Sequence, residues 1–222
     1  MGKSVYSLVL SDEVVAAVDE MAFKLNASRS SLINQVLAEY VSLVTPEKRM
    51  RDIYEELSQL LLNEGYQVVS QPSDSMLSVK SVLRYKYKPT IRYCVELARE
   101  QGESFGEIRV LSRTQSQGLL EALEDFYGLW VQLEKAYWQM RKTPGKPVQY
   151  IIENGRFHRQ FRLSQARRPL DEEEVGKAIA EYIQAFDTGI KLYFSLLHEP
   201  ADARRQVQKV YSDYVRGAQL PI

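Results

Sequence analysis

Two stretches of the 222-residue chain combine basic and aromatic side chains and contain no acidic residue: residues 80–92 and residues 156–168. Lysine and arginine bind phosphates and aromatic rings stack on bases, so this pattern is typical of sites for single-stranded nucleic acid. An arginine in either stretch can also hold the carboxylate or phosphate of a small molecule. The predicted anion or nucleic-acid patch consists of Lys80, Arg84, Lys86, Lys88, Arg156 and Arg162.

The same two stretches also have a simpler structural explanation. Successive side chains of a strand point to opposite faces, so alternation places the aromatic rings in a core and the basic groups on a solvated sheet face. The residue pattern favours this explanation for each stretch taken alone.

No residues in the chain form a pattern typical of catalysis or of metal binding. Cys94 is the only cysteine, and no arrangement of it with histidine and aspartate suggests a nucleophile. His158 and His198 are the only histidines, which makes a zinc site unexpected. Glycine-rich phosphate loops are absent, and the acidic run at 171–174 fits the start of a helix. We therefore expect no enzyme, no metal and no cofactor.

The composition is that of a globular protein with one or two domains. Lysine plus arginine and aspartate plus glutamate both total 29, so the formal net charge is zero. This balance excludes a strongly basic nucleic-acid coat protein and a polyacidic tail, but it permits a local patch. One cysteine fits a reducing compartment, and no signal-peptide core or membrane-spanning run is found. We expect a cytoplasmic protein that does not contact a membrane.

The first 45 residues predict one strand and two short helices. Residues 4–10 alternate as a strand does. Ser11 is expected to cap a helix over about 12–25, and Ser28 a second helix that ends before Thr45-Pro46. One strand face carries Tyr6, Leu8 and Leu10, and the other carries Lys3, Val5, Ser7 and Val9.

A unit this small cannot bury its apolar faces alone, and a single strand leaves both of its edges unpaired. Two copies solve both problems if their strands pair and their four helices interlock. This order and spacing resemble the ribbon-helix-helix family of bacterial regulators, the Arc, MetJ and CopG group, over residues 3–44. The most specific segments are 10–13, which lead into the first helix, and 28–33, which open the second.

The resemblance implies that the paired strands enter the major groove of double-stranded DNA. The base contacts carried over are Val5, Ser7 and Val9. Of these, only Ser7 can hydrogen-bond a base edge, whereas the valines can touch thymine methyl groups. The start of the second helix would hold a phosphate through its backbone amides. The implied phosphate contacts are Lys3, Ser28, Arg29 and Ser30, and a plain helix cap explains Ser28 as well.

Local charge favours a hypothesis of another class. Residues 1–46 hold three basic and five acidic side chains, whereas neutralisation of phosphates supplies most non-specific affinity for DNA. In this alternative the N-terminal module only dimerises, and the rest of the chain holds a protein partner, as an antitoxin or adaptor does. A third hypothesis is RNA or single-stranded DNA binding by the basic strands.

Beyond Thr45-Pro46 the pattern predicts a connecting helix over 47–64, which either extends the dimer module or belongs to the core of the next domain. Period-two segments predict strands at 76–87, 90–97, 107–112, 148–153 and 156–163, with a hairpin turn at Asn154-Gly155. Long amphipathic helices are expected at 115–142 and 171–197, and a last helix from Pro200 to about 216.

These elements make two β-β-α units, and a weak repeat relates them. The predicted fold class is α+β, with a ribbon-helix-helix dimer module at 1–46, the connecting helix at 47–64, and an α+β domain at 65–222 that has a pseudo-twofold repeat. The leading hypothesis is a homodimeric DNA-binding transcriptional regulator. Its C-terminal domain would bind a small anionic effector or a protein partner.

Overall fold

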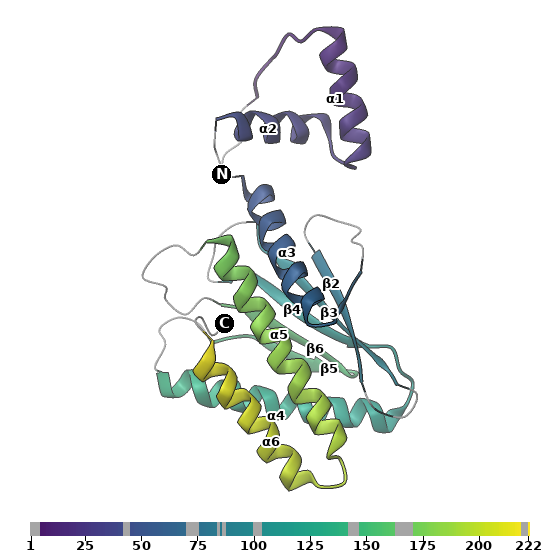
Figure 1. Ribbon diagram of the computed structural model, residues 1–222, viewed down its shortest axis with the longest axis vertical. Helices are drawn as coiled ribbons and strands as arrows, with labels where there is room; N and C mark the ends of the chain where they lie inside the picture. The colour runs from purple at the N-terminus through teal and green to yellow at the C-terminus, as the bar shows by residue number, and fades with distance from the viewer. Residues whose placement is uncertain are drawn as a thin grey trace. The chain divides into compact units, whose positions relative to one another are not determined.

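The computed structural model describes residues 5–41, 45–69, 76–83, 85, 88–99, 104–141, 147–162, 171–218 and 222. The chain divides into two compact units, Met1–Lys48 and Arg49–Ile222, and Figure 1 labels most of their elements. The described residues form six helices and one six-stranded antiparallel sheet, so the mixed α+β class is confirmed.

Two helices, α1 (Asp12–Lys24) and α2 (Arg29–Tyr40), lie in the first unit. Both predicted caps are confirmed, because Ser11 Oγ accepts a hydrogen bond from the Val14 amide and Ser28 Oγ accepts one from the Ser31 amide. Each serine thus satisfies an amide that a helix start otherwise leaves without a partner. Between the helices, Asn26 has a φ of 50°, in the left-handed region that asparagine tolerates better than most residues.

The predicted ribbon strand, described here as residues 5–10, forms no strand within the single chain. A two-stranded ribbon takes its second strand from another copy of the chain. The single chain therefore neither forms nor excludes the ribbon, and the strand stays a prediction.

Helix α3 (Pro46–Asn63) contributes to the core of the second unit. The Tyr54 hydroxyl accepts a hydrogen bond from the Leu97 amide at 2.9 Å and so fastens the helix to the sheet. Of the two roles that the sequence left open, this helix has the second, as part of the next domain's core. It ends before Gly65, whose φ of 82° suits glycine. Its buried side chains are Met50, Ile53, Tyr54, Leu57 and Leu61.

The sheet has the strand order β1-β2-β3-β4-β6-β5. Its strands are β1 (Gln67–Val69), β2 (Met76–Val82), β3 (Thr90–Leu97), β4 (Gly106–Ser112), β5 (Tyr150–Glu153) and β6 (Arg156–Phe161). Strand β1 was not predicted. Three residues are too few to show alternation, and β1 forms only as an edge strand beside β2.

The prediction of a strand over the whole of 76–87 was wrong, because β2 ends at Val82. Val82 is the partner of Thr90 in β3, so the chain must reverse direction between these two residues. The Leu83 amide donates to the Pro89 carbonyl oxygen, and Lys88 has a φ of 46°, which no extended strand contains. Tyr85 and Lys88, the described aromatic and basic residues after Val82, therefore lie beyond the strand.

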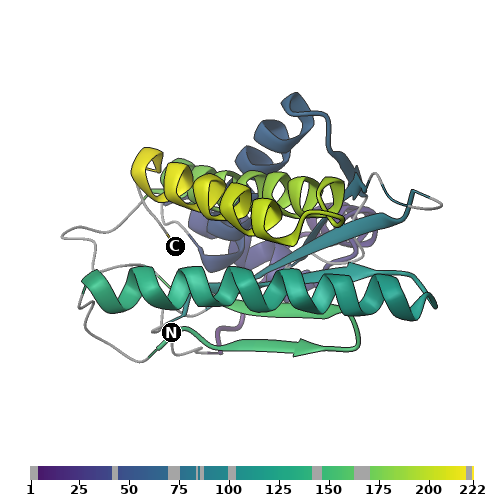
Figure 2. The ribbon, with the colours of Figure 1, turned by 90° about the horizontal axis from the view of Figure 1, so that it is seen from below.

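The remaining helices are α4 (Gln117–Arg141), α5 (Glu172–Ser195) and α6 (Pro200–Gly217). Helices α5 and α6 run side by side (Figures 1 and 2), and α6 also contacts α4. The core is centred on Phe186 of α5, whose ring centroid lies 5.1–5.2 Å from those of Phe126, Trp130 and Phe157. All four side chains are fully buried, as the apolar faces of the predicted amphipathic helices require of Phe126, Trp130 and Phe186.

The hairpin turn between β5 and β6 is also confirmed. Asn154 and Gly155 have φ values of 50° and 66°, the pair of positive values that a tight two-residue turn requires. An added Cβ at Gly155 would also meet the end of the Leu120 side chain, which would have to move. Strands β4 and β6 are antiparallel neighbours. A twofold axis that relates the β3–β4 pair to the β5–β6 pair would require this arrangement, but the repeat itself stays a prediction.

Candidate nucleic-acid interface and polar face of the sheet

The side chains that the resemblance assigns to base contact are exposed. Val5 and Val9 have relative exposures of 99% and 103%, and Ser7 is also exposed. Leu8 and Leu10 are less exposed, at 56% and 39%. Tyr6, on the same predicted face as these two leucines, is 84% exposed, so both faces of the segment are open to solvent in the single chain. Of the implied phosphate contacts, Lys3 lies outside the described residues.

The first unit leaves most of its large apolar side chains in solvent. Among its described residues, Ala22, Leu32, Ala38 and Thr45 are the buried ones. A unit that buries so little cannot be stable alone, and its uncovered apolar surface is typical of an interaction site. The exposed apolar side chains of the two helices include Val14, Val15, Met21, Val36, Leu37 and Tyr40.

The start of α2 combines a capping serine with two amides that have no partner. Ser28 Oγ accepts the Ser31 amide at 3.1 Å, so the helix-cap explanation of Ser28 is confirmed. The amides of Arg29 and Ser30 make no hydrogen bond within the described residues. Amides at a helix start attract anions, because they point along the positive end of the helix dipole.

Arg29 is engaged with another side chain, which the sequence did not indicate. Its guanidinium forms an ion pair with Asp19 of α1. The two residues are ten positions apart on different helices, so no helical spacing relates them. The Arg29 side chain is 67% exposed, and exposed pairs contribute only about 0–1 kcal/mol. A DNA phosphate can therefore compete with Asp19 for this arginine.

In the second unit, one face of the sheet packs in the core and the other carries polar side chains. We call the second the polar face. Opposite residues of antiparallel strands point to the same face, so the register arranges it in rows. In the first row, Lys80 of β2 is the partner of Arg92 of β3, and Arg92 is the partner of Leu111 of β4.

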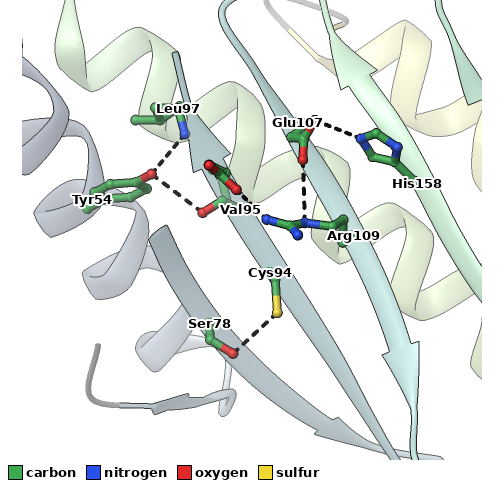
Figure 3. A network of polar contacts seen from close by, with 9 residues as sticks. Tyr54, Ser78, Cys94, Val95, Leu97, Glu107, Arg109 and His158 are labelled. Carbon is green, nitrogen blue, oxygen red and sulfur yellow. Dashed lines mark hydrogen bonds and ion pairs between the residues drawn. The ribbon is translucent and has the colours of Figure 1, made fainter. Parts of the chain in front are cut away.

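The next two rows contain a connected ionic network, which Figure 3 shows from close by. Arg109 has Cys94 and His158 as its partners in the ladders, and Glu96 is the partner of Glu107. Arg109 forms ion pairs with Glu96 and, at 3.4 Å, with Glu107. His158 Nε2 lies 2.8 Å from a Glu107 carboxylate oxygen. Glu96 and Glu107 therefore face the basic side chains of the middle row, Arg109 and His158. The first row, Lys80, Arg92 and Leu111, contains no carboxylate.

A half-open hollow of about 1420 Å³ lies where the first row meets the ends of β2 and β4. Several of its cations, namely Lys80, Arg92, Arg113 and Arg156, form no ion pair with any described residue. The excess of positive charge makes the hollow a candidate site for an anion. The charged side chains in its lining are Lys80, Arg92, Arg109, Arg113, Arg156, Lys191 and Glu153.

The structure brings together only part of the predicted basic patch. Lys80 and Arg156, one from each basic stretch, line the same hollow. Lys88 is exposed in the turn after β2, and Arg162 is half-buried after β6, and both lie outside the lining. The other two predicted patch residues, Arg84 and Lys86, lie outside the described residues.

Four basic residues of the lining were not in the predicted patch: Arg92, Arg109, Arg113 and Lys191. Arg92 and Arg109 occupy outward positions of strands whose alternation was recognised, so an assignment of strand neighbours would have grouped them. Lys191 lies on α5, far along the chain, and no local pattern indicates it.

Asp187 of α5 positions this lysine at the rim of the hollow. It is buried, and its carboxylate lies 2.6 Å from Lys191 Nζ. It also accepts hydrogen bonds from the hydroxyls of Tyr93 at 2.8 Å, Ser81 at 3.0 Å and Tyr66 at 3.1 Å. Burial and the Asp187 charge raise the pKa of Tyr93 well above its usual value, so this hydroxyl stays a donor.

The expectation that all basic residues of 156–168 face solvent was wrong at Arg159, which is fully buried. It shares the core face with Phe157, and its Nε donates to Glu134 of α4 at 2.9 Å. Tyr150 at 2.6 Å and Trp130 at 2.9 Å also donate to Glu134. Burial alone would lower the pKa of Arg159, but the negative charge of Glu134 has the larger combined effect with its neighbours, and the pKa lies above its usual value. Arg159 is therefore a charged structural residue.

Comparisons with protein-family models, with curated proteins and with solved structures found no match to this chain. The described residues contain no cluster of three histidine, cysteine or acidic side chains suited to a metal ion. Among the described helices, none has both the length and the apolar character needed to cross a bilayer.

Proposed function

We propose that the chain is a homodimeric transcriptional regulator that binds double-stranded DNA through a ribbon-helix-helix module in its first unit. The observation that carries this proposal is the exposed apolar surface of the first unit, on an alternating segment followed by two serine-capped helices. A second copy would cover this surface by pairing the segments and interlocking the helices.

DNA binding in this dimer is led by phosphate contacts. The amides of Arg29 and Ser30 are available for a phosphate at the start of α2. The Arg29 guanidinium adds a charge once it exchanges Asp19 for the phosphate. Base contacts come from Ser7 as a hydrogen-bonding group and from Val5 and Val9 against thymine methyl groups.

The experiment that tests this function is a titration of the full chain with mixed-sequence duplex DNA over a series of salt concentrations, with single-stranded DNA as competitor. Preference for duplex and a steep fall in affinity with salt are expected, because binding releases counterions from the phosphates. No binding even at low salt would contradict DNA recognition and leave the first unit as a dimerisation module.

Arg29→Ala is expected to lower affinity evenly across DNA sequences. It should reduce the salt slope by about one unit for each copy of the chain in the complex, because one phosphate contact is lost. Asp19→Asn is expected to act in the opposite direction, since it frees the guanidinium for DNA. Lys24→Ala is the control, because Lys24 is exposed and pairs only with Glu20 of its own helix. An unchanged salt slope in Arg29→Ala would remove this residue from the mechanism.

A second candidate function is an antitoxin-like or adaptor scaffold, in which the first unit only dimerises. The ion pair that occupies Arg29 and the acidic balance of residues 1–46 favour it. A stable dimer that fails to bind duplex DNA, with and without Asp19→Asn, would select this function over the first.

A further inference from the structure

Two cations stand directly opposite each other at the edge of the hollow. Lys80 and Arg92 are partners in the β2–β3 ladder, so both side chains leave the same face of the sheet. Like charges at opposite positions destabilise a sheet. Neither side chain forms an ion pair with any described residue. The pair therefore keeps an unfavourable interaction that a bound negative group would relieve.

Three acidic side chains beside the hollow already pair with cations. Glu96 and Glu107 bind Arg109, and Asp187 binds Lys191. Among the described lining residues, the one carboxylate belongs to Glu153, which stands opposite Arg156 in the β5–β6 ladder. The cations that remain without a carboxylate opposite or in contact, among the described residues, are Lys80, Arg92 and Arg113.

The lining also indicates which class of anion fits. Neighbouring strands are about 4.8 Å apart, so Lys80 and Arg92 can hold two adjacent phosphate groups. Leu111, which is half-buried, follows Arg92 in the same row and offers an apolar surface to an organic group. Phe157 is the only phenylalanine, tyrosine or tryptophan among the described lining residues, and it is fully buried. Bases of a single strand would find no exposed ring for stacking.

We propose that the hollow binds a small organic molecule that carries at least two adjacent phosphate groups. Lys80 and Arg92 hold the phosphates, Arg113 adds a third cation, and the organic part lies over Leu111 towards Arg156. This site belongs to the second unit and does not rest on DNA binding by the first.

The experiment measures thermal unfolding of the full chain with orthophosphate, pyrophosphate or ADP at constant ionic strength. The chain has two tryptophans, Trp130 and Trp138, and both lie in the second unit, so their fluorescence reports on the unit that holds the hollow. Pyrophosphate and ADP are expected to raise the midpoint in a saturable manner, and orthophosphate is expected to do so less, because it spans only one cation.

Two variants and a control make the test specific. Lys80→Gln and Arg92→Gln should each weaken pyrophosphate binding by about tenfold or more, because each removes a charged hydrogen-bond donor. Without pyrophosphate, both variants should unfold at the same or a higher temperature, because like-charge repulsion is removed. Arg51→Gln on α3 is the control, since Arg51 is exposed and outside the hollow.

An unchanged midpoint with pyrophosphate would overturn the proposal, as would a pyrophosphate effect that persists in both variants. Tighter binding of a single-stranded oligonucleotide than of pyrophosphate, lost in Arg92→Gln, would overturn it in favour of nucleic acid.

Discussion

Replacing Glu134 by alanine is expected to lower the free energy of unfolding of the second unit by about 3–5 kcal/mol. The substitution leaves the Arg159 guanidinium buried and charged without its carboxylate partner, since both side chains are at most 1% exposed. It also removes the acceptor of the Tyr150 hydroxyl and the nearer of two acceptors of the Trp130 indole, which keeps the Tyr182 hydroxyl at 3.2 Å. A buried donor without a partner costs about 1–3 kcal/mol, so the losses act in the same direction.

Urea unfolding of the full chain, followed by circular dichroism and tryptophan fluorescence, measures this effect. Glu121→Ala is a matched control on the same helix, because Glu121 is exposed and should change stability by less than about 0.5 kcal/mol. The double variant Glu134→Leu with Arg159→Met should recover much of the loss, since no unpaired charge remains. A loss below about 1 kcal/mol in Glu134→Ala would show that the pair is open to solvent in solution.

The sequence predicted those elements that depend on interactions between residues close together in the chain. The capping serines Ser11 and Ser28, the positive-φ turn at Asn154-Gly155 and the inward stripes of the long helices all depend on residues close in the chain. Strand β1 depends on its neighbour β2, and three residues carry no periodic signal of their own.

The prediction for Arg159 failed because it relied on residue type, and a charged residue is normally expected in solvent. An arginine in a basic run is usually solvated, and nothing near Arg159 indicates that Glu134, 25 positions earlier on a helix, neutralises it in the core. The alternation itself was informative, because position 159 lies between the inward positions 157 and 161 of the same strand. Trusting periodicity over residue type would have placed this arginine in the core.

The hollow could not be predicted because it depends on strand order. The sequence placed Lys80 and Arg156 in separate basic stretches, and only the pairing of β4 with β6 brings the hairpin of Arg156 beside β3 and β2. The uncompensated Lys80–Arg92 pair depends on register, because a slip by one residue would move either side chain to the core face.

Leu8→Asp is expected to convert the proposed dimer to a monomer and to unfold the first unit. In the proposed ribbon, Leu8 lies on the face that the second copy covers, and two carboxylates would then be buried without partners. Each unpaired buried charge costs several kcal/mol, roughly, and the first unit buries too little alone to absorb this loss. Sedimentation gives the oligomeric state, and loss of helical circular dichroism reports on α1 and α2.

The neighbouring position supplies the control, because successive side chains of a strand point to opposite faces. Ser7→Asp should keep the proposed dimer and weaken its proposed DNA binding, since Ser7 lies on the outward face of the proposed ribbon and the new charge would repel phosphate. Tryptophan fluorescence should stay unchanged in both variants, because both tryptophans lie in the second unit. If Leu8→Asp remains a folded dimer while Ser7→Asp dissociates, the ribbon is shifted by one residue. In that register, Leu8 would face the DNA and Ser7 would lie in the dimer interface.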